Sequence, residues 1–545
     1  MRGWMFVTAM CLLSGLASAQ EADLPTTRKT ISPDELTSAP IVLKPIAELL
    51  KTKPDGLAPV PPDAELQAAR RDVKKQFSQQ SSAARTPEAK SQLAVDVYNT
   101  SVDEKSKAVE YALLERSVEL GVAARDWRFA CWVLSQMGKV FDVDVLPMKA
   151  EAISDCTALS KTPGGAWKLA RGWSALAKEA IARDDFELAA RCVDKADAAA
   201  RKSEDDVLKE QMAQRRGDVK DLAEAYAEAK SAKETLQKDP QDAAAALTWG
   251  RFVCLTKADM TRGLPFMAHG EGPLAELAKR EAGSQLAPDQ VKLGDDWAKL
   301  ADSETDAKAK RVMKMWAATH YRAARAGVPE NEQRALDVKA IAIESEYPVL
   351  PVGKWVSVLP LINLKAGTTG GKWRWEGESA INEPGKMAGL AIPIELDGSY
   401  DVQIRFSRRE GSDMVQSFYP FGVSKFQVTL CNILAGVHGI YQQTGAGVDG
   451  KKHYVRPGDL KNNYVYTMFV KVVRDGNNGS IDVALDGAPL LHWDGPITNF
   501  LRNDGDSLFD RGLLLVSRNV VVRYDDVSIR VHSGTVRHSL PRTTH

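Results

Sequence analysis

Alternating apolar and polar residues dominate the C-terminal third of the chain and predict β-strands. Ile481, Val483 and Leu485 alternate with Asp, Ala and Asp, and the same period of two recurs in residues 400–407. A period of two sends successive side chains to opposite faces, so each strand has one buried and one hydrated face. The pattern predicts an antiparallel β-sandwich over residues 346–535.

Tight turns separate the strongest of these strands. Asp486-Gly487 lies between two alternating runs, and a glycine-rich turn occupies residues 475–479. Such turns require positive φ angles, which Gly, Asn and Asp adopt at little cost. We therefore expect consecutive strands in this region to pair as antiparallel hairpins.

Residues 90–345 show helical spacing and a composition rich in Ala, Leu, Glu, Lys and Arg. In 102–122 the apolar residues lie broadly on one side of a helix, as in an amphipathic helix packed on a core. Residues 203–240 form a long charged run that ends at Asp239-Pro240. We interpret it as one long helix whose charges form a hydrated face.

Three helix junctions in this region share one pattern: an Asp, an apolar anchor and, three residues after the anchor, a small residue. The anchors are Trp127, Phe186 and Met260, and the small residues are Ala130, Ala189 and Gly263. Asp can cap the second helix of each pair, and a small residue lets two helices approach closely. The junction resembles the turn of tetratricopeptide (TPR) repeats, but the intervals between anchors are irregular. The pattern predicts an irregular, TPR-like α-helical array.

The first nineteen residues are typical of a secretory signal peptide. Arg2 precedes an apolar run from Trp4 to Leu16, and Ala17-Ser18-Ala19 suits a cleavage site after Ala19. The run is short for a membrane span, and no later apolar stretch is long enough to be one. We expect an exported protein of the periplasm, the cell surface or the medium, without a transmembrane segment after cleavage.

The remaining segments look extended. Eight prolines fall within residues 20–63, where each removes a backbone donor and disfavours helix before it. We predict a largely disordered Pro-rich linker over 20–89 and a flexible tail over 536–545.

Charge and cysteine content narrow the functional classes. Lys plus Arg equals Asp plus Glu at 72 each, so no global field favours nucleic acid as a partner. Five cysteines remain after signal cleavage, with no CxxC pair, so neither a zinc knuckle nor a redox motif is encoded. One disulfide among the first four and buried free thiols both fit this spacing.

Two blocks of sequence resemble modules of secreted planctomycete proteins. WGRFVCLTKADMTRGLPFMAHGEGPLAELAKRE (249–281), with VKLGDDWAKLAD (291–302), resembles their TPR-like helical module. LPVGKWVSVLPLINL (350–364), with IDVALDGAPLLHWDG (481–495), resembles the β-module that follows it, a concanavalin A-like, laminin-G-like jelly roll. The resemblance implies the fold of residues 245–531, because its motifs are turns, caps and core aromatics.

Catalytic motifs are missing from the sequence. Retaining glycosidases on concanavalin-like folds use two carboxyl groups about 5 Å apart, commonly from Glu-x-Asp-x-Glu on one strand. No such pattern occurs in 352–531; Glu376 with Glu378, and Asp525-Asp526, lack the third acid. HExxH and GxSxG are also absent. The sequence favours a non-enzymatic protein, with a glycan-acting hydrolase built from acids on separate strands as the rival.

One acidic loop is a candidate calcium site. Asn503, Asp504, Asp506 and Asp510 supply oxygen ligands at short spacing, although not in the EF-hand pattern. A surface loop rich in Asp and Gly is the favoured interpretation. A structural Ca²⁺ is the alternative, and we predict no other cofactor.

Aromatic residues are the candidate carbohydrate-binding groups, because sugar rings stack on aromatic faces. Trp373 and Trp375 share one strand face, and Tyr441, His453 and Tyr454 lie in a glycine-rich excursion. The alternative for the tryptophans is that they fill or cap the sandwich core. Long loops on rigid β scaffolds often carry binding, which favours the excursion.

Together these patterns predict an exported, non-enzymatic binding or scaffold protein. The helical array would contact a protein partner, and the jelly roll would bind carbohydrate or another envelope component. A glycan-acting hydrolase and a purely structural envelope protein are the alternatives.

Overall fold

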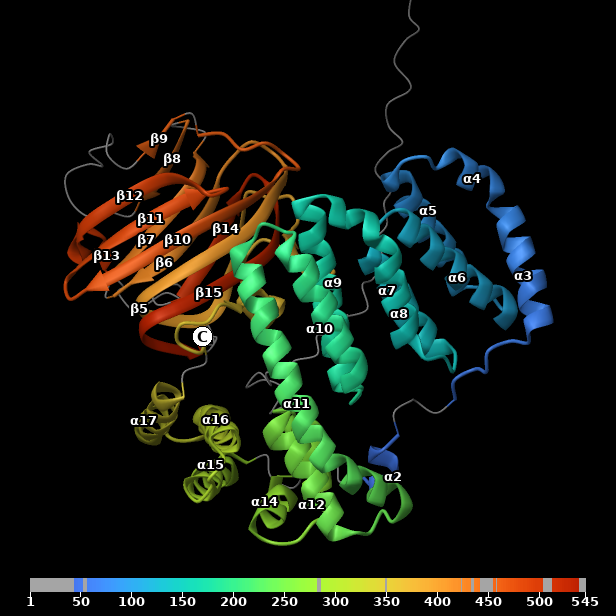
Figure 1. Cartoon of the computed structure of the whole chain (residues 1–545). Coiled ribbons are helices and arrows are strands. Elements are labelled where there is room, and N and C mark those ends of the chain that lie inside the picture. Colours follow the sequence, from blue (N-terminus) through green and yellow to red (C-terminus); the bar gives the residue numbers. More distant parts are fainter. Residues whose placement is uncertain are drawn as a thin grey trace, which may run out of the picture.

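Helices form the first part of the chain and antiparallel strands the second, as the sequence predicts (Figure 1). The change from helix to strand falls between Glu346 and Val356, at the predicted boundary. The computed structural model describes residues 44–51, 56–281, 286–347, 350–422, 424–432, 436–441, 454–456, 458–502 and 512–538.

The helical region contains a series of helices that pack mainly on their neighbours in sequence. They are α2 (Ile46–Leu49), α3 (Asp63–Gln76), α4 (Ser78–Ala83), α5 (Pro87–Val102), α6 (Lys107–Ala123), α7 (Trp127–Val140), α8 (Val145–Asp155), α9 (Pro163–Ala182), α10 (Phe186–Arg201), α11 (Asp206–Lys238), α12 (Ala243–Arg251), α13 (Met260–Met267), α14 (Pro273–Glu281), α15 (Ala287–Asp302), α16 (Ala307–Ala324) and α17 (Glu330–Glu346). The predicted long charged helix is α11. Figure 1 shows α9, α10 and α11 between the sandwich and the helices α3 to α8.

The helical region begins earlier than the sequence predicts. Residues 20–89 were expected to form a largely disordered linker, but α3 and α4 lie within that range. Proline is accepted at a helix start, and Pro62 precedes the first residue of α3. Leu66, Ala69 and Val73 then bury one side of α3. An amphipathic helix therefore begins immediately after the last proline of this segment, although the proline content predicted an extended chain.

The three predicted junctions are capped as expected. Side chains of Asp126, Asp185 and Asp259 accept hydrogen bonds from backbone N–H groups three residues further on, at the starts of α7, α10 and α13. The small residues Ala130, Ala189 and Gly263 are buried. A Cβ added at Gly263 would collide with the backbone and side chain of Cys254. Close helix approach at these positions is confirmed.

A buried carboxylate organises the last helices of the array. Glu281 Oε1 accepts hydrogen bonds from the indoles of Trp297 (2.5 Å) and Trp316 (2.8 Å), and His320 Nε2 lies 2.8 Å from the same oxygen. Gln290 Oε1 lies 2.6 Å from His320 Nδ1. These residues are buried in the core of the last helices.

The strands of the second region form one continuous antiparallel network. They are β1 (Val356–Ser357), β2 (Thr368–Gly370), β3 (Trp373–Glu376), β4 (Ser379–Asn382), β5 (Met387–Glu410), β6 (Val415–Phe421), β7 (Ser424–Asn432), β8 (Val437–Tyr441), β9 (Tyr454–Val455), β10 (Val465–Asp475), β11 (Asn478–Leu485), β12 (Ala488–Pro496), β13 (Leu501–Arg502), β14 (Gly512–Arg518) and β15 (Val521–His538), with a short helix α18 (Leu364–Gly367) before β2. The last strand extends into the predicted flexible tail, because residues 536–538 pair with β5.

Two long strands fold this network into two layers. The second half of β5 pairs with β10 and β15, giving a first layer in the order β12-β11-β10-β5-β15-β4-β3. The first half of β5 pairs with β2 and β14, giving a second layer in the order β2-β5-β14-β6-β7-β8-β9. At the corner Gly398 faces Gly534, both with positive φ, and an added Cβ at either would overlap the opposite backbone. Glycine is required here because the strands bend where their backbones touch.

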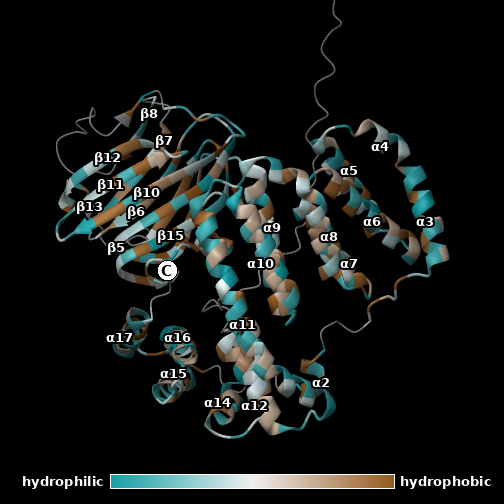
Figure 2. Cartoon of the chain, in the orientation of Figure 1, coloured by the Kyte–Doolittle hydropathy of each residue, from teal (hydrophilic) through white to brown (hydrophobic). Residues whose placement is uncertain are grey.

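The core of the sandwich lies between the layers. Val402, Ile404 and Phe406 of the first layer and Leu390 and Ile392 of the second belong to one buried cluster. Figure 2 shows hydrophobic and hydrophilic residues alternating along the strands. Antiparallel sandwich architecture, predicted from this alternation, is confirmed.

The predicted hairpin turns also have the expected backbone. Asp486 and Gly487 have φ of 50° and 78°, and Gly476 has φ of 57°. The described cysteines are free thiols, so no disulfide links the first four. In the described part of the chain, no helix combines the length and the apolar character needed to cross a bilayer.

Candidate functional site

Helices cover the outer face of the first layer, where the side chains of β5 and β15 that point away from the core lie. Gln211 Nε2 of α11 donates to Ser528 Oγ of β15 (2.9 Å). Gln403 Nε2 of β5 donates to the carboxylate of Asp205, the cap of α11 (3.3 Å). The Arg405 guanidinium lies 4.5 Å from the ring of Trp167 in α9. This face is therefore a contact between the two regions of the chain.

A buried arginine connects the regions most directly. Arg171 of α9 lies 3.3 Å from a carboxylate oxygen of Glu378 and 3.4 Å from one of Asp526. Ser357 and Ser528 each donate a hydrogen bond to Asp526 (2.6 and 2.5 Å). Burial would raise the pKa of Glu378, but the positive charge of Arg171 outweighs it and lowers that pKa below its ordinary value. Arg171 thus lies within ion-pair distance of both acids.

The other two acids noted in the sequence are also neutralised. Arg523 donates to Glu376 (2.8 Å) and to Asp525 (2.9 Å), and Ser379 Oγ donates to Asp525 (2.8 Å). Burial would raise the pKa of Asp525, but Arg523 and Arg128 lower it. A general acid needs a raised pKa and a nucleophile needs a free oxygen. The lowered pKa of Asp525 does not meet the first condition, and Glu376 and Asp525 both lie in ion pairs with Arg523.

The outer face of the second layer has a different character. Residues that pair directly across six neighbouring strand pairs form one line over this face. A second line of paired residues lies two residues further along the strands, on the same face. The first line is Gly370, Gly389, Val516, Gln416, Thr429, Gly439 and Tyr454, and the second is Ala391, Leu514, Phe418, Gln427 and Tyr441. Intervening residues such as Leu515 and Val428 point into the core. We call these two lines the amide–aromatic face; none of its residues is acidic or basic.

Some residues of this face are buried, and others around them are partly exposed. Thr429 is 1% exposed and Gln427 is 6% exposed, and Gln427 Nε2 donates to Thr429 Oγ1 (2.6 Å). Gln416, Phe418 and Tyr441 are partly exposed around them. Three residues of the first line are glycines, which have no side chain to project from the sheet. Glycine at such positions is typical where a ligand approaches a strand closely. The face combines hydrogen-bonding amides with partly exposed rings.

The structure distributes the predicted aromatic residues over two edges. Trp373 and Trp375 lie on one face of β3, as predicted, and both pack against the sandwich core while partly exposed. The Trp373 ring is 6.0 Å from that of Tyr524. β3 ends the first layer, whereas Tyr441 lies on β8, near the far edge of the second layer. The tryptophans and Tyr441 are therefore not parts of one site.

One predicted residue of the glycine-rich excursion, Tyr454, lies on β9 and pairs with Gly439. Other predicted residues cannot be placed, because they lie outside the described part of the chain. His453 and the candidate calcium ligands Asp504, Asp506 and Asp510 lie outside the described residues. Among the described residues, no cluster of three or more His, Cys, Asp or Glu side chains has the arrangement of a metal site.

The sequence patterns did not single out Gln416, Phe418 and Gln427 of the amide–aromatic face. Gln416 and Phe418 alternate with core residues in VQSFYPF (415–421), so periodicity alone would have placed them on the outer face. Their proximity to Gln427 and Tyr441 follows from strand register, which the sequence does not encode locally.

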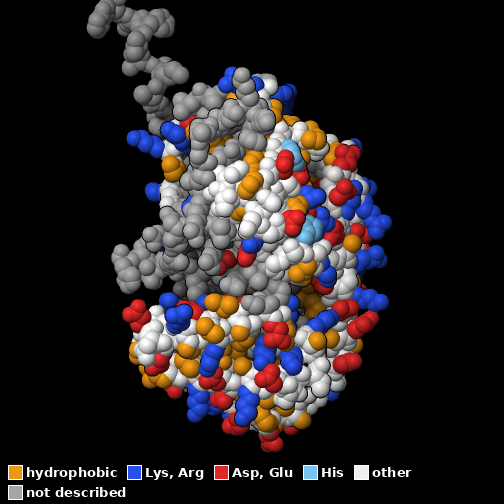
Figure 3. All heavy atoms as spheres, turned by 90° about the vertical axis from the view of Figure 1, so that its left-hand side faces the viewer, with side chains coloured by type: hydrophobic (Ala, Val, Ile, Leu, Met, Phe, Trp, Pro, Cys, Tyr) orange, Lys and Arg blue, Asp and Glu red, His pale blue; other side chains and the backbone are white. Residues whose placement is uncertain are grey.

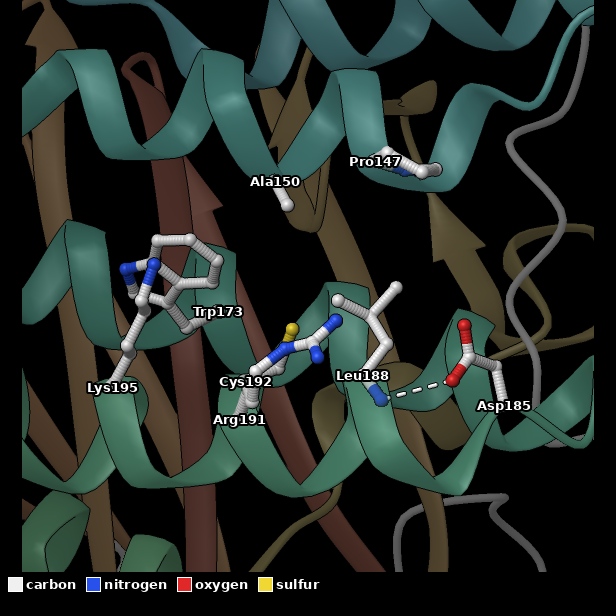
Figure 4. Close-up of a pocket in the computed structure, with 8 residues that line it drawn as sticks. All are labelled: Pro147, Ala150, Trp173, Asp185, Leu188, Arg191, Cys192 and Lys195. Carbon is white, nitrogen blue, oxygen red and sulfur yellow. Dashed lines mark hydrogen bonds between the residues drawn. The ribbon is translucent and has the colours of Figure 1, made fainter.

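A cavity of about 210 Å³ lies in the helical array between α8, α9 and α10 (Figure 4). Lys195 Nζ lies 4.2 Å from the centre of the Trp173 ring, and the Asp185 carboxylate accepts from Leu188 N. Cys192 lines the same cavity and is fully buried. Ligand sites commonly enclose about 300–1,000 Å³, so we interpret this cavity as a groove between packed helices.

The visible surface carries no single-sign field. Figure 3 shows acidic and basic side chains interspersed over the described part of that side of the molecule. On the outer face of β12, His492 lies between Asp482 (2.6 Å) and Asp494 (3.2 Å), and hydrogen bonds to these acids raise the pKa of His492. This distribution agrees with the balanced charge of the sequence.

No family model matches the chain, and no curated protein does. Solved structures match parts of it. The carbohydrate-binding module CBM66 from Bacillus subtilis is 9% identical over 32% of this chain and 94% of its own, with a TM-score of 0.20. The endo-1,3-beta-glucanase from Streptomyces sioyaensis is 10% identical over 29% of this chain and 78% of its own, with a TM-score of 0.22. A Bacillus subtilis protein with a galectin-like fold is 13% identical over 33% of this chain and 90% of its own, with a TM-score of 0.20. The fold assignment therefore rests on the strand pairing, and these likenesses assign no activity.

Proposed function

We propose that this chain is an exported, non-enzymatic binding protein whose sandwich binds carbohydrate on the amide–aromatic face. The observation that carries the proposal is the composition of that face: partly exposed Phe418 and Tyr441 lie beside Gln416 and Gln427, without a charged side chain. Aromatic rings accept the apolar faces of sugars, and amides both donate to and accept from hydroxyl groups.

The position of the helical array supports this choice of face. Helices α9 and α11 and their caps contact the outer side of the first layer through Trp167, Asp205 and Gln211. These contacts between helices and strands therefore fall on the first layer, whereas the proposed face lies on the second layer. The helical array would in turn present its remaining surfaces to a protein partner, as arrays of helix pairs do.

The pairing of the acids supports a non-enzymatic role. Glu376, Glu378, Asp525 and Asp526 each lie within ion-pair distance of Arg171 or Arg523. A retaining or inverting glycosidase needs one protonated and one free carboxyl group facing the substrate.

A glycan array, with and without calcium, tests the proposal on the chain from residue 20. We expect binding to at least one class of glycan, and a loss of about fivefold or more in Phe418→Ala, because a ring contact contributes about 1 kcal/mol. His492→Ala, on the exposed face of the first layer, is the matched control and should bind like the wild type.

Three results would contradict the proposal. Cleavage of a bound glycan, seen as new products by chromatography, would favour the hydrolase. Absence of binding to every glycan class would favour the purely structural protein. Binding that Phe418→Ala leaves unchanged would move the site away from this face.

A further inference from the structure

A second group of polar and charged residues, some without a hydrogen-bond partner in the described chain, lies where the helical array meets the first layer. Arg405 of β5 stacks on Trp167 of α9, and its Nη2 lies near the start of that helix, 3.9 Å from where a Cβ on Gly164 would stand. The turn between β3 and β4 approaches α7, since a Cβ on Gly377 would stand 3.2 Å from Arg128 Cδ. Residues of α7, α9, β5 and the turn between β3 and β4 therefore lie close together.

Most of these side chains are positively charged. We define the cationic cluster as Arg128 (α7), Lys168 (α9), Arg405 and Arg409 (β5) and Arg523 (β15). Desolvation lowers the pKa of Lys168, and Arg128, Arg523 and Arg409 lower it further. Arg128 and Arg405 both act on Asp525, the partner of Arg523. Arg128, Arg409 and Arg523 thus lie within electrostatic reach of Lys168, and Arg405 lies within electrostatic reach of Asp525.

Not every cation of this group has an ion pair among the described residues. Arg523 is paired with Glu376 and Asp525, whereas the described partners of Arg405 and Arg409 are the hydroxyl of Thr467 (3.5 Å) and the amide oxygen of Asn463 (3.4 Å). In the described part of the chain, neither Lys168 nor Arg128 has an ion pair, and Arg128 Nε is buried without an acceptor. Arg171, one turn along α9 from Lys168, contacts two carboxylates.

A buried hydroxyl lies among the residues of the cationic cluster. Ser407 lies between Arg405 and Arg409 on the outward side of β5 and pairs in register with Arg523. It is 1% exposed, and its Oγ has no hydrogen-bond partner in the described chain. Buried polar groups without partners are rare in native proteins and commonly mark the place of a ligand, an ion or a water.

We propose that the cationic cluster binds the sulfate or carboxylate group of an acidic polysaccharide. Such an oxyanion accepts hydrogen bonds from guanidinium groups in a planar fork, and it accepts one more from a hydroxyl. Lys168 is exposed, which gives the group a route in, and exposed Tyr464 lies near Arg405, where a sugar ring next to the anion would meet it. This site is separate from the amide–aromatic face and does not depend on it.

Calorimetric titration of the chain from residue 20 tests the inference. Dextran sulfate and polygalacturonate are the two acidic probes, neutral dextran and duplex DNA are the polymer controls, and sodium sulfate tests the isolated anion. We expect one or both acidic polysaccharides to bind, with an affinity that falls as salt rises. Neutral dextran should not compete for this site.

Five variants locate the site. Lys168→Ala and Arg409→Ala each remove one accessible cation and should weaken binding about tenfold, while Lys168→Arg should retain it. Lys220→Ala, on the exposed surface of α11, removes the same charge elsewhere and should change affinity less than twofold. Ser407→Ala should weaken binding without lowering the melting temperature, because it removes a hydroxyl that has no partner in the folded chain.

The outcomes decide the inference in either direction. It fails if neither acidic polysaccharide binds, if DNA binds as tightly as both, or if Lys220→Ala weakens binding as much as Lys168→Ala. It also fails if Ser407→Ala and Arg409→Ala bind like the wild type. Because Phe418→Ala should leave the acidic probes unaffected, failure here is distinguishable from failure of the proposed neutral-glycan face.

Discussion

The ion pairs of Arg171 make a quantitative prediction about how the two regions of the chain are held together. The Arg171 and Asp526 side chains are each 8% exposed, and Glu378 is 28% exposed. Arg171→Met keeps the volume of the side chain but leaves two carboxylates at the interface without their cation. Removing one partner of a buried ion pair costs about 3–5 kcal/mol, so we expect a loss in that range.

Urea unfolding, followed by tryptophan fluorescence and by circular dichroism, measures this loss. The change in the free energy of unfolding follows from the midpoint shift and the m-value. Arg191→Met is the matched control, because Arg191 and Glu187 form an exposed pair (60% and 85%) whose loss should cost less than about 1 kcal/mol. Adding Asp526→Asn to Arg171→Met should recover part of the loss, since it removes one of the stranded charges.

A small effect would refute this reasoning. If Arg171→Met shifts the midpoint no more than Arg191→Met, the buried pairs do not hold the helices against the first layer. A double variant no more stable than Arg171→Met would show that Asp526 is not coupled to Arg171.

Two further predictions concern the array and the corner of the sandwich. Burial would raise the pKa of Asp184, but Lys257 and other cations lower it from 3.8 to about 2, so its contribution is present above about pH 4 and is lost as pH falls toward 2. The stability difference between wild type and Asp184→Asn, about 2 kcal/mol at pH 5, should shrink over that window; a constant difference between pH 5 and 2 would contradict the assignment. Gly398→Ala places a Cβ against the Ser533 carbonyl at positive φ and should lower the melting temperature by more than Gly476→Ala, whose Cβ would stand in open space; equal shifts would show that the corner is not built on Gly398.

Local patterns accounted for the fold where one physical rule governs a short segment. Asp126 and Asp185 cap helices because a carboxylate satisfies N–H groups at a helix start. The turn at Asp486-Gly487 has the positive φ angles that its residues tolerate. Helix α3 was missed because its start lies against prolines, which suit a first helical turn as well as an extended chain.

The candidate sites depended on contacts that no local pattern encodes. Phe418 and Gln427 meet only because β6 pairs with β7 in one register. Arg171 and Asp526 are 355 residues apart in the sequence (526 − 171), and they come into contact because α9 packs against β15. Each of the acids noted in the sequence therefore lies beside an arginine, either Arg171 or Arg523.

Hydroxyl-radical footprinting, with and without the glycan that binds most tightly on the array, tests the central claim most directly. The account predicts that Phe418 and Tyr441 on the amide–aromatic face become protected, while the exposed Tyr464 of the first layer keeps its reactivity when the glycan is neutral. Protection of Trp373 and Trp375 with no change at Phe418 and Tyr441 would contradict it.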